Sequence, residues 1–110
     1  MNVQSNKANS INNRRDKLDL ITIDLFGSAR LLTDKSKVYI SCTRATEIRK
    51  ILQKLAEAEP KLVGTVISDD GNSLIKSFTL NLNGARFISN MDEIIVPGDN
   101  VLIFSSQSGG

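Results

Sequence analysis

The sequence predicts an α+β domain in which a mixed sheet of four to five strands is covered by one main helix. Short stretches near both ends of the chain alternate apolar and polar residues, which is the period of a half-buried strand. Between them, apolar residues recur at spacings of three and four, which is the period of a helix packed on one face. The length of 110 residues corresponds to one domain.

Two strands are expected before the helix. Residues 18–26 read LDLITIDLF, where apolar residues alternate with threonine and aspartate, and this pattern predicts the first strand. Gly27 and Ser28 are expected to turn the chain. The stretch Lys37–Ser41 predicts a second short strand, and the two strands together indicate a hairpin.

The main helix is predicted between Thr43 and Pro60. Thr43 is a suitable N-cap, because its hydroxyl can accept a hydrogen bond from a free N–H of the first turn, and Pro60 cannot continue a helix. Residues 61–67 are compatible with either an irregular strand or a short helical turn. The helix has one apolar stripe, which we expect to be core, formed by Ala45, Ile48, Ile51, Leu52, Leu55 and Ala56.

The C-terminal half predicts a second group of strands. Phe78–Leu82 alternates apolar and polar residues, which predicts a strand, and the Asn-Gly pair at 83–84 is typical of a type I′ hairpin turn. Residues 86–88 are expected to form the returning strand of this hairpin. After another turn at 97–100, Val101–Phe104 is a continuous apolar run. Such a run predicts a strand that is buried on both faces and therefore lies in the middle of the sheet.

This order of elements indicates a β-grasp domain of the ubiquitin-like kind, with the helix on one face of the sheet. If the first strand pairs in parallel with the last, the crossover through the helix is expected to be right-handed. We divide the chain into a disordered polar leader at residues 1–17, the β-grasp domain at 18–104 and a flexible tail at 105–110.

The composition argues against several classes of protein. The chain has no histidine and a single cysteine, Cys42, so the commonest general base, the commonest zinc ligand and a disulfide within the chain are all excluded. The acidic loop at 68–73 lacks the spacing and the closing glutamate of an EF-hand. We therefore expect neither a self-contained hydrolase nor a metal site, and we expect Cys42 to be a buried or inert thiol.

The charge is unevenly placed. The net charge is +2, and the first 17 residues contribute +3 of it, so the remainder carries −1. A folded part without a basic excess argues against direct nucleic-acid binding. No apolar run approaches the ~20 residues needed to span a bilayer, and the N-terminus lacks the apolar stretch of a secretory signal, so a cytoplasmic protein without membrane contact is expected.

The sequence ends with Ser108-Gly109-Gly110, and this diglycine end is its most informative feature. Glycine has no Cβ, so two glycines can pass through a channel too narrow for other residues. The six residues beyond Phe104 can reach roughly 20 Å when extended. We therefore expect a carrier whose reacting group is the carboxylate of Gly110, with Gly109 permitting its passage.

Four short segments occur in this order along the chain: Leu25–Leu32, Asn81–Gly84, Pro97–Val101 and Ser108–Gly110. The first of them comes at the end of the first strand and contains Phe26 and Arg30 in a Phe-x-x-x-Arg spacing. The order of the four segments resembles the MoaD/ThiS sulfur carriers and, more distantly, the ubiquitin-related modifiers. The Phe-x-x-x-Arg spacing is similar to the MoaD branch. The serines at 105–106 stand where MoaD proteins usually carry a proline pair, and are more similar to the modifier branch.

The resemblance implies a carrier and not an enzyme. A ubiquitin-activating-type adenylyltransferase would use ATP to join AMP to the carboxylate of Gly110, and a sulfur donor protein would convert it to a thiocarboxylate. The chain itself would bind no cofactor stably. The first acceptor implied is a precursor of the molybdenum cofactor, with this chain acting beside the larger subunit of molybdopterin synthase. A protein modifier, a carrier for tRNA thiolation and a β-grasp binding module without C-terminal chemistry are the alternatives.

Docking to such partners is expected to use a few large apolar anchors. Phe26, Phe87 and Phe104 are the candidates, with Arg30 as a contact at the rim. A phenylalanine in a sheet is also a common core residue, so Phe26 and Phe104 are open to that interpretation, and Arg30 is open to that of a solvated surface charge.

Overall fold

The computed structural model describes residues 19–106. Its helices are α2 (Ser28–Thr33), α3 (Ile48–Ala58) and the short 3-10 helix η1 (Pro60–Leu62). None of the helices in this range is both long enough and apolar enough to cross a membrane. The strands are β1 (Leu20–Leu25), β2 (Lys37–Ser41), β3 (Thr46–Glu47), β4 (Phe78–Leu82), β5 (Arg86–Ile88), β6 (Ile94–Ile95) and β7 (Asn100–Ser105).

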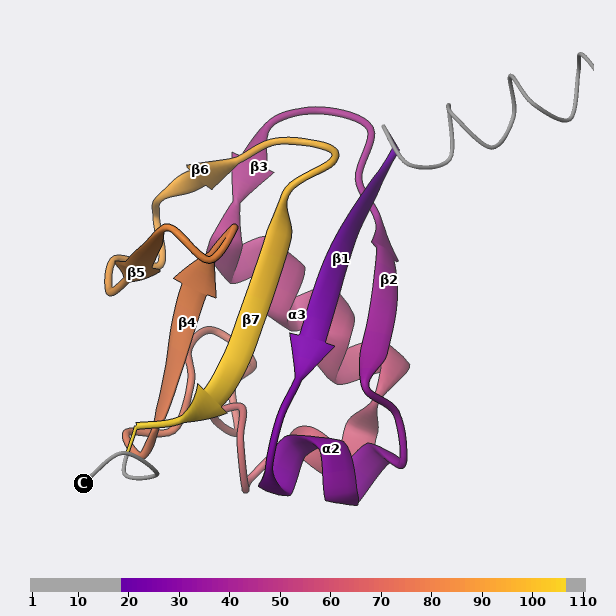
Figure 1. Cartoon of the computed structure of the whole chain (residues 1–110), viewed down its shortest axis with the longest axis vertical. Helices are drawn as coiled ribbons and strands as arrows, with labels where there is room; N and C mark the ends of the chain where they lie inside the picture. The colour runs from indigo at the N-terminus through magenta and orange to yellow at the C-terminus, as the bar shows by residue number, and fades with distance from the viewer. Residues whose placement is uncertain (1–18, 107–110) are drawn as a thin grey trace, which may run out of the picture.

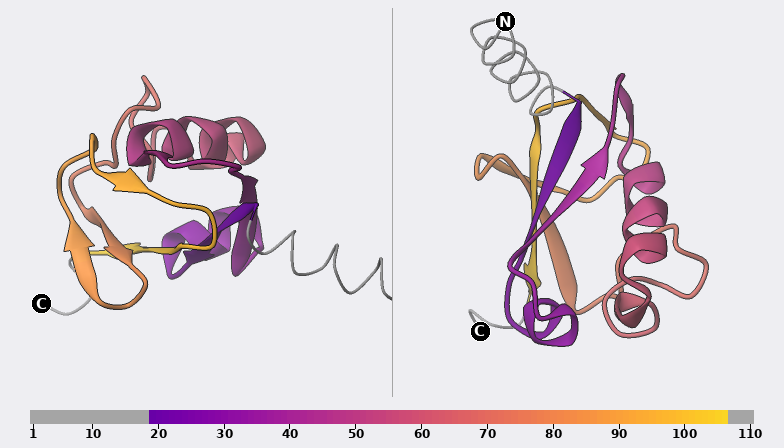
Figure 2. Two further views of the ribbon diagram at one scale, coloured as in Figure 1. Left: turned by 90° about the horizontal axis from the view of Figure 1, so that it is seen from above. Right: turned by 90° about the vertical axis from the view of Figure 1, so that its right-hand side faces the viewer.

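Two sheets are formed by the described strands. The large sheet has five strands in the order β2-β1-β7-β4-β5, and the small one pairs β3 with β6. Helix α3 lies across one face of the large sheet, and no element of residues 19–106 forms a second layer over the other face, which we call the outer face (Figure 1; Figure 2). This is the α+β arrangement that the sequence predicts.

The last strand, β7, lies in the middle of the large sheet. It runs parallel to β1, with Ile23 beside Val101, and antiparallel to β4, with Leu80 beside Ile103. The central position and the parallel pairing are as predicted. The predicted burial on both faces of β7 is wrong: Val101 and Ile103 are completely buried under α3, whereas the alternate residues Leu102 and Phe104 are only half-buried on the outer face. A single covering layer shields only one side of the strand.

The core lies between α3 and the inner face of the sheet. The apolar stripe of the helix is buried as predicted, with Ile48, Ile51, Leu52 and Leu55 fully excluded from solvent. Ala45 does not belong to it, because it precedes the helix and is exposed. The strands contribute Ile21, Ile23, Leu25, Val38, Ile40, Leu80, Leu82, Ile88, Ile95, Val101 and Ile103.

The start of α3 differs from the prediction. Thr43 is not its N-cap: the helix begins at Ile48, after strand β3, and no side chain caps it. Two backbone carbonyls of the β6 region cap it instead. The N–H of Ile48 donates to the carbonyl of Glu93 at 2.9 Å, and that of Arg49 donates to the carbonyl of Met91 at 3.0 Å. Two of the free N–H groups of the first turn are therefore satisfied by tertiary contacts.

The connections show one further difference. β1 and β2 pair antiparallel as expected, but the chain between them forms helix α2 where a simple turn is predicted at residues 27–28. Gly27 enters α2 with φ 57°, a conformation that favours glycine. The turn at Asn83 and Gly84 has φ of 59° and 71°, which fits the predicted type I′ geometry. Within residues 61–67, the first two belong to η1, and Val63 and Ile67 form isolated β-bridges. Neither the irregular strand nor the helical turn expected from the sequence describes this stretch fully.

Candidate functional site

The end of β7 is the base from which the C-terminal segment leaves the domain. β7 ends at Ser105, which pairs with Phe78, and the N–H of Ser106 donates to the carbonyl of Ser77 at 2.7 Å. The pairing with β1 ends at Ile103, so it is β4 that fixes this base relative to the sheet. Gly109 and Gly110 lie outside the described residues, as does the leader predicted at residues 1–17.

Three phenylalanines gather on the outer face beside this base. The ring of Phe104, near the end of β7, makes edge contacts with Phe26 at 6.3 Å and with Phe87 at 6.0 Å between ring centroids. Phe26 directly follows β1, and its N–H donates to the carbonyl of Ile103 on β7 at 3.2 Å. Phe87 comes from β5. We call these three residues the aromatic cluster.

The aromatic cluster is a surface feature. Phe87 is 64% exposed and Phe26 is 43% exposed, while Phe104 is half-buried between them. The core interpretation of Phe26 and Phe104 is therefore wrong, because neither belongs to the buried core. The sequence indicates each of the three phenylalanines as a separate candidate for docking, and the fold brings them together from three segments. Leu102 lies on the same face two residues before Phe104, and the alternation of β7 is the signal that places it there.

Arg30 projects from α2 near the same end of the sheet. Its side chain is exposed, and no carboxylate within residues 19–106 forms an ion pair with it. Leu31 beside it is 84% exposed. An unpaired cation next to exposed apolar side chains is typical of the rim of a docking surface.

A polar network occupies the other part of the outer face. Asp24 is 9% exposed as a residue, and its carboxylate accepts hydrogen bonds from the ammonium group of Lys37 at 2.5 Å and from the Asn100 carboxamide at 2.8 Å. The hydrogen bond to Asp24 raises the pKa of Lys37 above its ordinary value. A buried carboxylate needs such partners, so this network is a structural feature of the sheet.

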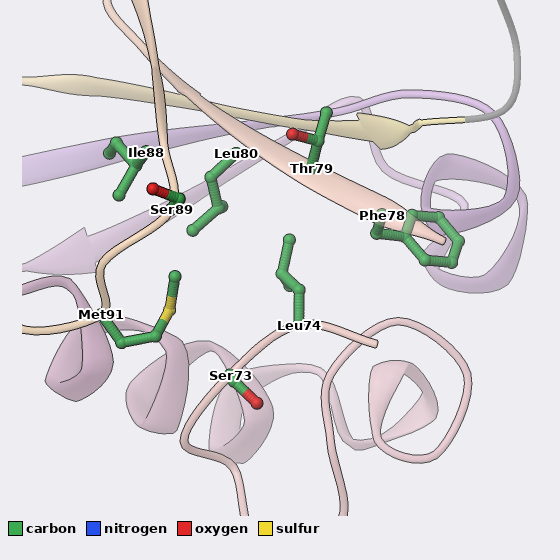
Figure 3. A pocket seen from close by; sticks show the side chains of 8 residues that line it. All are labelled: Ser73, Leu74, Phe78, Thr79, Leu80, Ile88, Ser89 and Met91. Atoms are coloured by element: carbon green, nitrogen blue, oxygen red, sulfur yellow. The ribbon is translucent and has the colours of Figure 1, made fainter. Parts of the chain in front are cut away.

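Two hollows lie away from the aromatic cluster. The one in Figure 3 has a volume of about 260 Å³ and opens between the sheet and the helix layer, where Leu74, Phe78 and Met91 pack against the core. The polar side chains that line it are the hydroxyl-bearing Ser73, Thr79 and Ser89, and none of its lining residues has a side chain that titrates near neutral pH. The other, about 480 Å³, is bounded by Leu20, Thr22, Lys37, Tyr39 and Gly98 on the outer face. Neither hollow contains a nucleophile beside a base.

Metal chemistry has no support in the described part of the chain. Residues 19–106 contain no group of three potential ligands among cysteine, aspartate and glutamate that could hold an ion. Cys42 is buried, and its thiol donates to the carbonyl of Arg44 at 3.2 Å. This agrees with the prediction of a buried thiol.

Comparison with known proteins defines the class of fold. No protein-family model matches the sequence, and no curated protein matches it either. Solved structures do match. SAMP1 from Haloferax volcanii superposes with a TM-score of 0.70 at 22% identity, over 83% of this chain and 99% of that one.

Two further structures extend the likeness. The putative molybdopterin converting factor subunit 1 from Pyrococcus furiosus has a TM-score of 0.59 at 20% identity, over 78% of this chain and 95% of that one. Urm1 from Trypanosoma brucei has a TM-score of 0.54 at 20% identity, over 84% and 96% of the two chains. The chain thus has a MoaD/ThiS-like, ubiquitin-like β-grasp fold, as the sequence predicts.

Proposed function

We propose that this protein is a sulfur carrier whose reacting group is the carboxylate of Gly110. The observation that carries the proposal is the Gly109-Gly110 end of the sequence, which is separated by three residues from the central strand β7 of a β-grasp fold. The aromatic cluster at the base of this segment supports the proposal, because a partner that acts on the terminus needs a docking surface close to it.

The chemistry begins with activation. A carboxylate resists nucleophiles because it is negatively charged and its oxygen leaves poorly. In a partner adenylyltransferase of the ubiquitin-activating type, the Gly110 carboxylate attacks the α-phosphate of ATP, pyrophosphate leaves, and an acyl-AMP forms. ATP is bound by the partner and not by this chain. The protein acts as a co-substrate and is not itself an enzyme.

Sulfur then replaces AMP. The terminal sulfur of a persulfide on a donor protein attacks the acyl carbon, and AMP leaves with the bonding electron pair. A second thiol of the donor cleaves the resulting sulfur–sulfur bond, which releases the thiocarboxylate and leaves a disulfide on the donor. The thiocarboxylate is then a good nucleophile for a sulfur acceptor.

The partner docks on the outer face. Phe87, Phe104 and Phe26 are the apolar anchors, and Arg30 is the rim contact for a carboxylate of the partner. Glycine at 109 and 110 lets the terminus enter a narrow active-site channel, since no Cβ blocks it.

The acceptor that we propose first is a precursor of the molybdenum cofactor, with this chain as the small subunit beside a larger synthase subunit in the cytoplasm. The likeness to a putative molybdopterin converting factor subunit supports this choice. The second candidate is a protein modifier or a tRNA-thiolation carrier. The higher TM-score with the modifier SAMP1, the likeness to Urm1 and the serines at 105–106 favour it.

The test is activation of the full chain by its cognate adenylyltransferase with ATP, followed by intact-mass measurement. We expect an acyl-AMP on Gly110, and none on a chain lacking Gly110. Phe87→Ala is expected to reduce kcat/KM about 30-fold, which corresponds to a hot-spot loss of about 2 kcal/mol. Absence of the acyl-AMP with every candidate activating enzyme of the source genome would overturn the proposal.

Protein isolated from its native cells separates the two candidates. A chain that has gained the mass difference between sulfur and oxygen indicates the carrier. A ladder of larger covalent conjugates ending at Gly110 indicates the modifier. Co-purification with a larger synthase subunit supports the molybdenum-cofactor acceptor.

A further inference from the structure

Asn83 and Gly84 form the exposed turn between β4 and β5, and they are the one Asn-Gly pair in the sequence. Such a pair can deamidate without an enzyme. The backbone nitrogen of the glycine attacks the side-chain carbonyl carbon of the asparagine, and no Cβ hinders its approach. A Cβ added at Gly84 would meet no atom within 4 Å, so the surrounding structure does not crowd this peptide either. The local sequence and the exposure of the turn therefore both favour the reaction.

Two hydrogen bonds hold the side chain of Asn83 away from its own backbone. Its Oδ1 accepts the N–H of Asn100 at 2.7 Å, and its Nδ2 donates to Oδ1 of Asp99 at 3.1 Å. We call these two hydrogen bonds the carboxamide clamp. Attack by the nitrogen of Gly84 requires the carboxamide to turn towards this nitrogen, so both hydrogen bonds must break before the reaction can start.

The residues that complete the carboxamide clamp are themselves fixed. Oδ2 of Asp99 accepts the N–H of Val96 at 2.9 Å, and the carbonyl of Asp99 accepts the N–H of Thr22 at 3.2 Å. The backbone N–H of Asn83 donates to the carbonyl of Asn100 at 2.7 Å. In Figure 1, the turn between β4 and β5 lies beside the start of β7. The clamp therefore joins the β4–β5 hairpin to the central strand.

We propose that Asn83 is a site of spontaneous deamidation and that the carboxamide clamp limits the rate of this reaction. When the clamp opens, the nitrogen of Gly84 forms a bond to Cγ of Asn83, and the bond from Cγ to Nδ2 breaks. The proton of the Gly84 N–H passes through water to the departing ammonia. Water then opens the resulting succinimide at one of its two carbonyl carbons, which gives aspartate or isoaspartate. Water is the only co-reactant, and nothing is oxidised or reduced.

Both products weaken the junction between the hairpin and β7. In aspartate, an anionic oxygen takes the place of the Nδ2 donor and faces the carboxylate of Asp99, so attraction becomes repulsion. Isoaspartate adds an atom to the backbone of a two-residue turn. That turn is closed by the hydrogen bond from the N–H of Ala85 to the carbonyl of Leu82 at 2.9 Å, which the longer backbone cannot keep unchanged.

The effect of deamidation extends to the aromatic cluster. Phe87 lies on β5, which pairs with β4 alone among the described strands, and its ring contacts that of Phe104 on β7. The register of β5 therefore depends on the turn at Asn83 and Gly84. A deamidated chain is expected to lose the ordered contact between the two rings. The inference makes no use of the chemistry at Gly110.

The experiment is a time course of the full chain at mildly alkaline pH, with native protein and protein in urea sampled in parallel. Peptide mapping by mass spectrometry locates the mass gain that results from exchange of ammonia for water. In urea, we expect this gain at Asn83 before any other asparagine. In the native chain, we expect the reaction at Asn83 to be at least about tenfold slower, because the carboxamide clamp must open first. Labelling with an isoaspartyl methyltransferase is expected to detect isoaspartate at this position.

Variants of Asp99 test the carboxamide clamp. Asp99→Ala removes the acceptor of Nδ2, so we expect deamidation of native Asn83 to be roughly fivefold faster. Asp99→Asn restores an acceptor oxygen and is expected to bring the rate back towards that of the wild type. Asn72, whose Oδ1 accepts a hydrogen bond from Gln53, is the internal reference, because general unfolding would accelerate its deamidation as well. We expect its rate, and all rates in urea, to be the same in these variants.

Two variants of Asn83 separate the reaction from its consequence. Asn83→Gln keeps a carboxamide on a longer side chain that does not close the five-membered ring, and no mass gain is expected at this position. Asn83→Asp reproduces the aspartate product, and NMR is expected to show loss of the contact between the rings of Phe87 and Phe104. Asn72→Asp makes the same change of charge away from the turn and is expected to keep this contact.

Three results would overturn the proposal. The first is absence of a mass gain at Asn83 in urea, or an earlier gain at another asparagine. The second is an equal rate in native and unfolded protein, or an Asp99→Ala rate equal to that of the wild type. The third is an unchanged ring contact in Asn83→Asp. All three can be measured whether or not Gly110 is adenylated, so failure of this inference and failure of the proposed function are distinguishable.

Discussion

Truncation of Leu52 tests the packing of α3 on the sheet. Leu52 is fully buried, and Leu52→Ala removes three apolar carbon groups from the centre of the core. At about 0.8 kcal/mol for each buried group, the transfer term alone is about 2.4 kcal/mol. The cavity adds to this, so we expect the free energy of unfolding to fall by about 3–4 kcal/mol, within the range seen for buried leucines.

Urea unfolding followed by circular dichroism measures this change as a shift in midpoint at constant slope. In a thermal melt, the same loss lowers Tm by roughly 12–30 °C for a domain of this size. Leu31→Ala is the matched control, because Leu31 is also helical but 84% exposed, and it is expected to change stability by less than about 0.5 kcal/mol. A cost for Leu52→Ala below about 1 kcal/mol, or equal to that of the control, would refute the packing.

The ion pair and the hairpin turn give three further tests. Lys37→Met is expected to lower the free energy of unfolding at neutral pH. The difference in this free energy between variant and wild type should shrink as pH rises through the raised pKa of Lys37, above 10.5, because the wild type then loses the Lys37 charge. A difference that does not change with pH in urea unfolding would contradict this prediction. Gly84→Ala should cost about 1–2 kcal/mol, because φ is 71° although a Cβ would meet no atom within 4 Å; an unchanged melt contradicts it. Asn83→Gly keeps the positive φ but loses the side-chain hydrogen bonds to Asn100 and Asp99. We expect the free energy of unfolding in urea to fall by roughly 1–2 kcal/mol. An unchanged value would show that these hydrogen bonds do not contribute to stability.

The sequence predicts those elements whose local pattern already contains their periodicity. Strands Lys37–Ser41 and Phe78–Leu82 have the predicted bounds, because alternation and flanking turn residues define them locally. Helix α2 was not predicted, since six residues after Gly27 are too few to establish a helical period. Thr43 failed as the N-cap because the pairing of Thr46 with Ile95 draws this stretch into β3. No local pattern reports such a long-range pairing.

The candidate site shows the same division. The residues of the aromatic cluster could be named from the sequence, because phenylalanines are common docking anchors. Their contact could not, since Phe26 follows β1 while Phe87 and Phe104 belong to β5 and β7, and only the strand order brings the three together. The apolar run in β7 indicated a central strand correctly. It could not indicate which of its faces stays open, because that depends on which side α3 covers.

The central position of β7 means that the domain folds only when the chain has been synthesised as far as Ser105. A chain that stops before Asn100 lacks the strand between β1 and β4, so the two halves of the sheet have no common neighbour and most of the inner face loses its partner. During synthesis, the domain can close only after its final strand has emerged. A chain that ends before this strand is thus left unfolded and open to proteolysis.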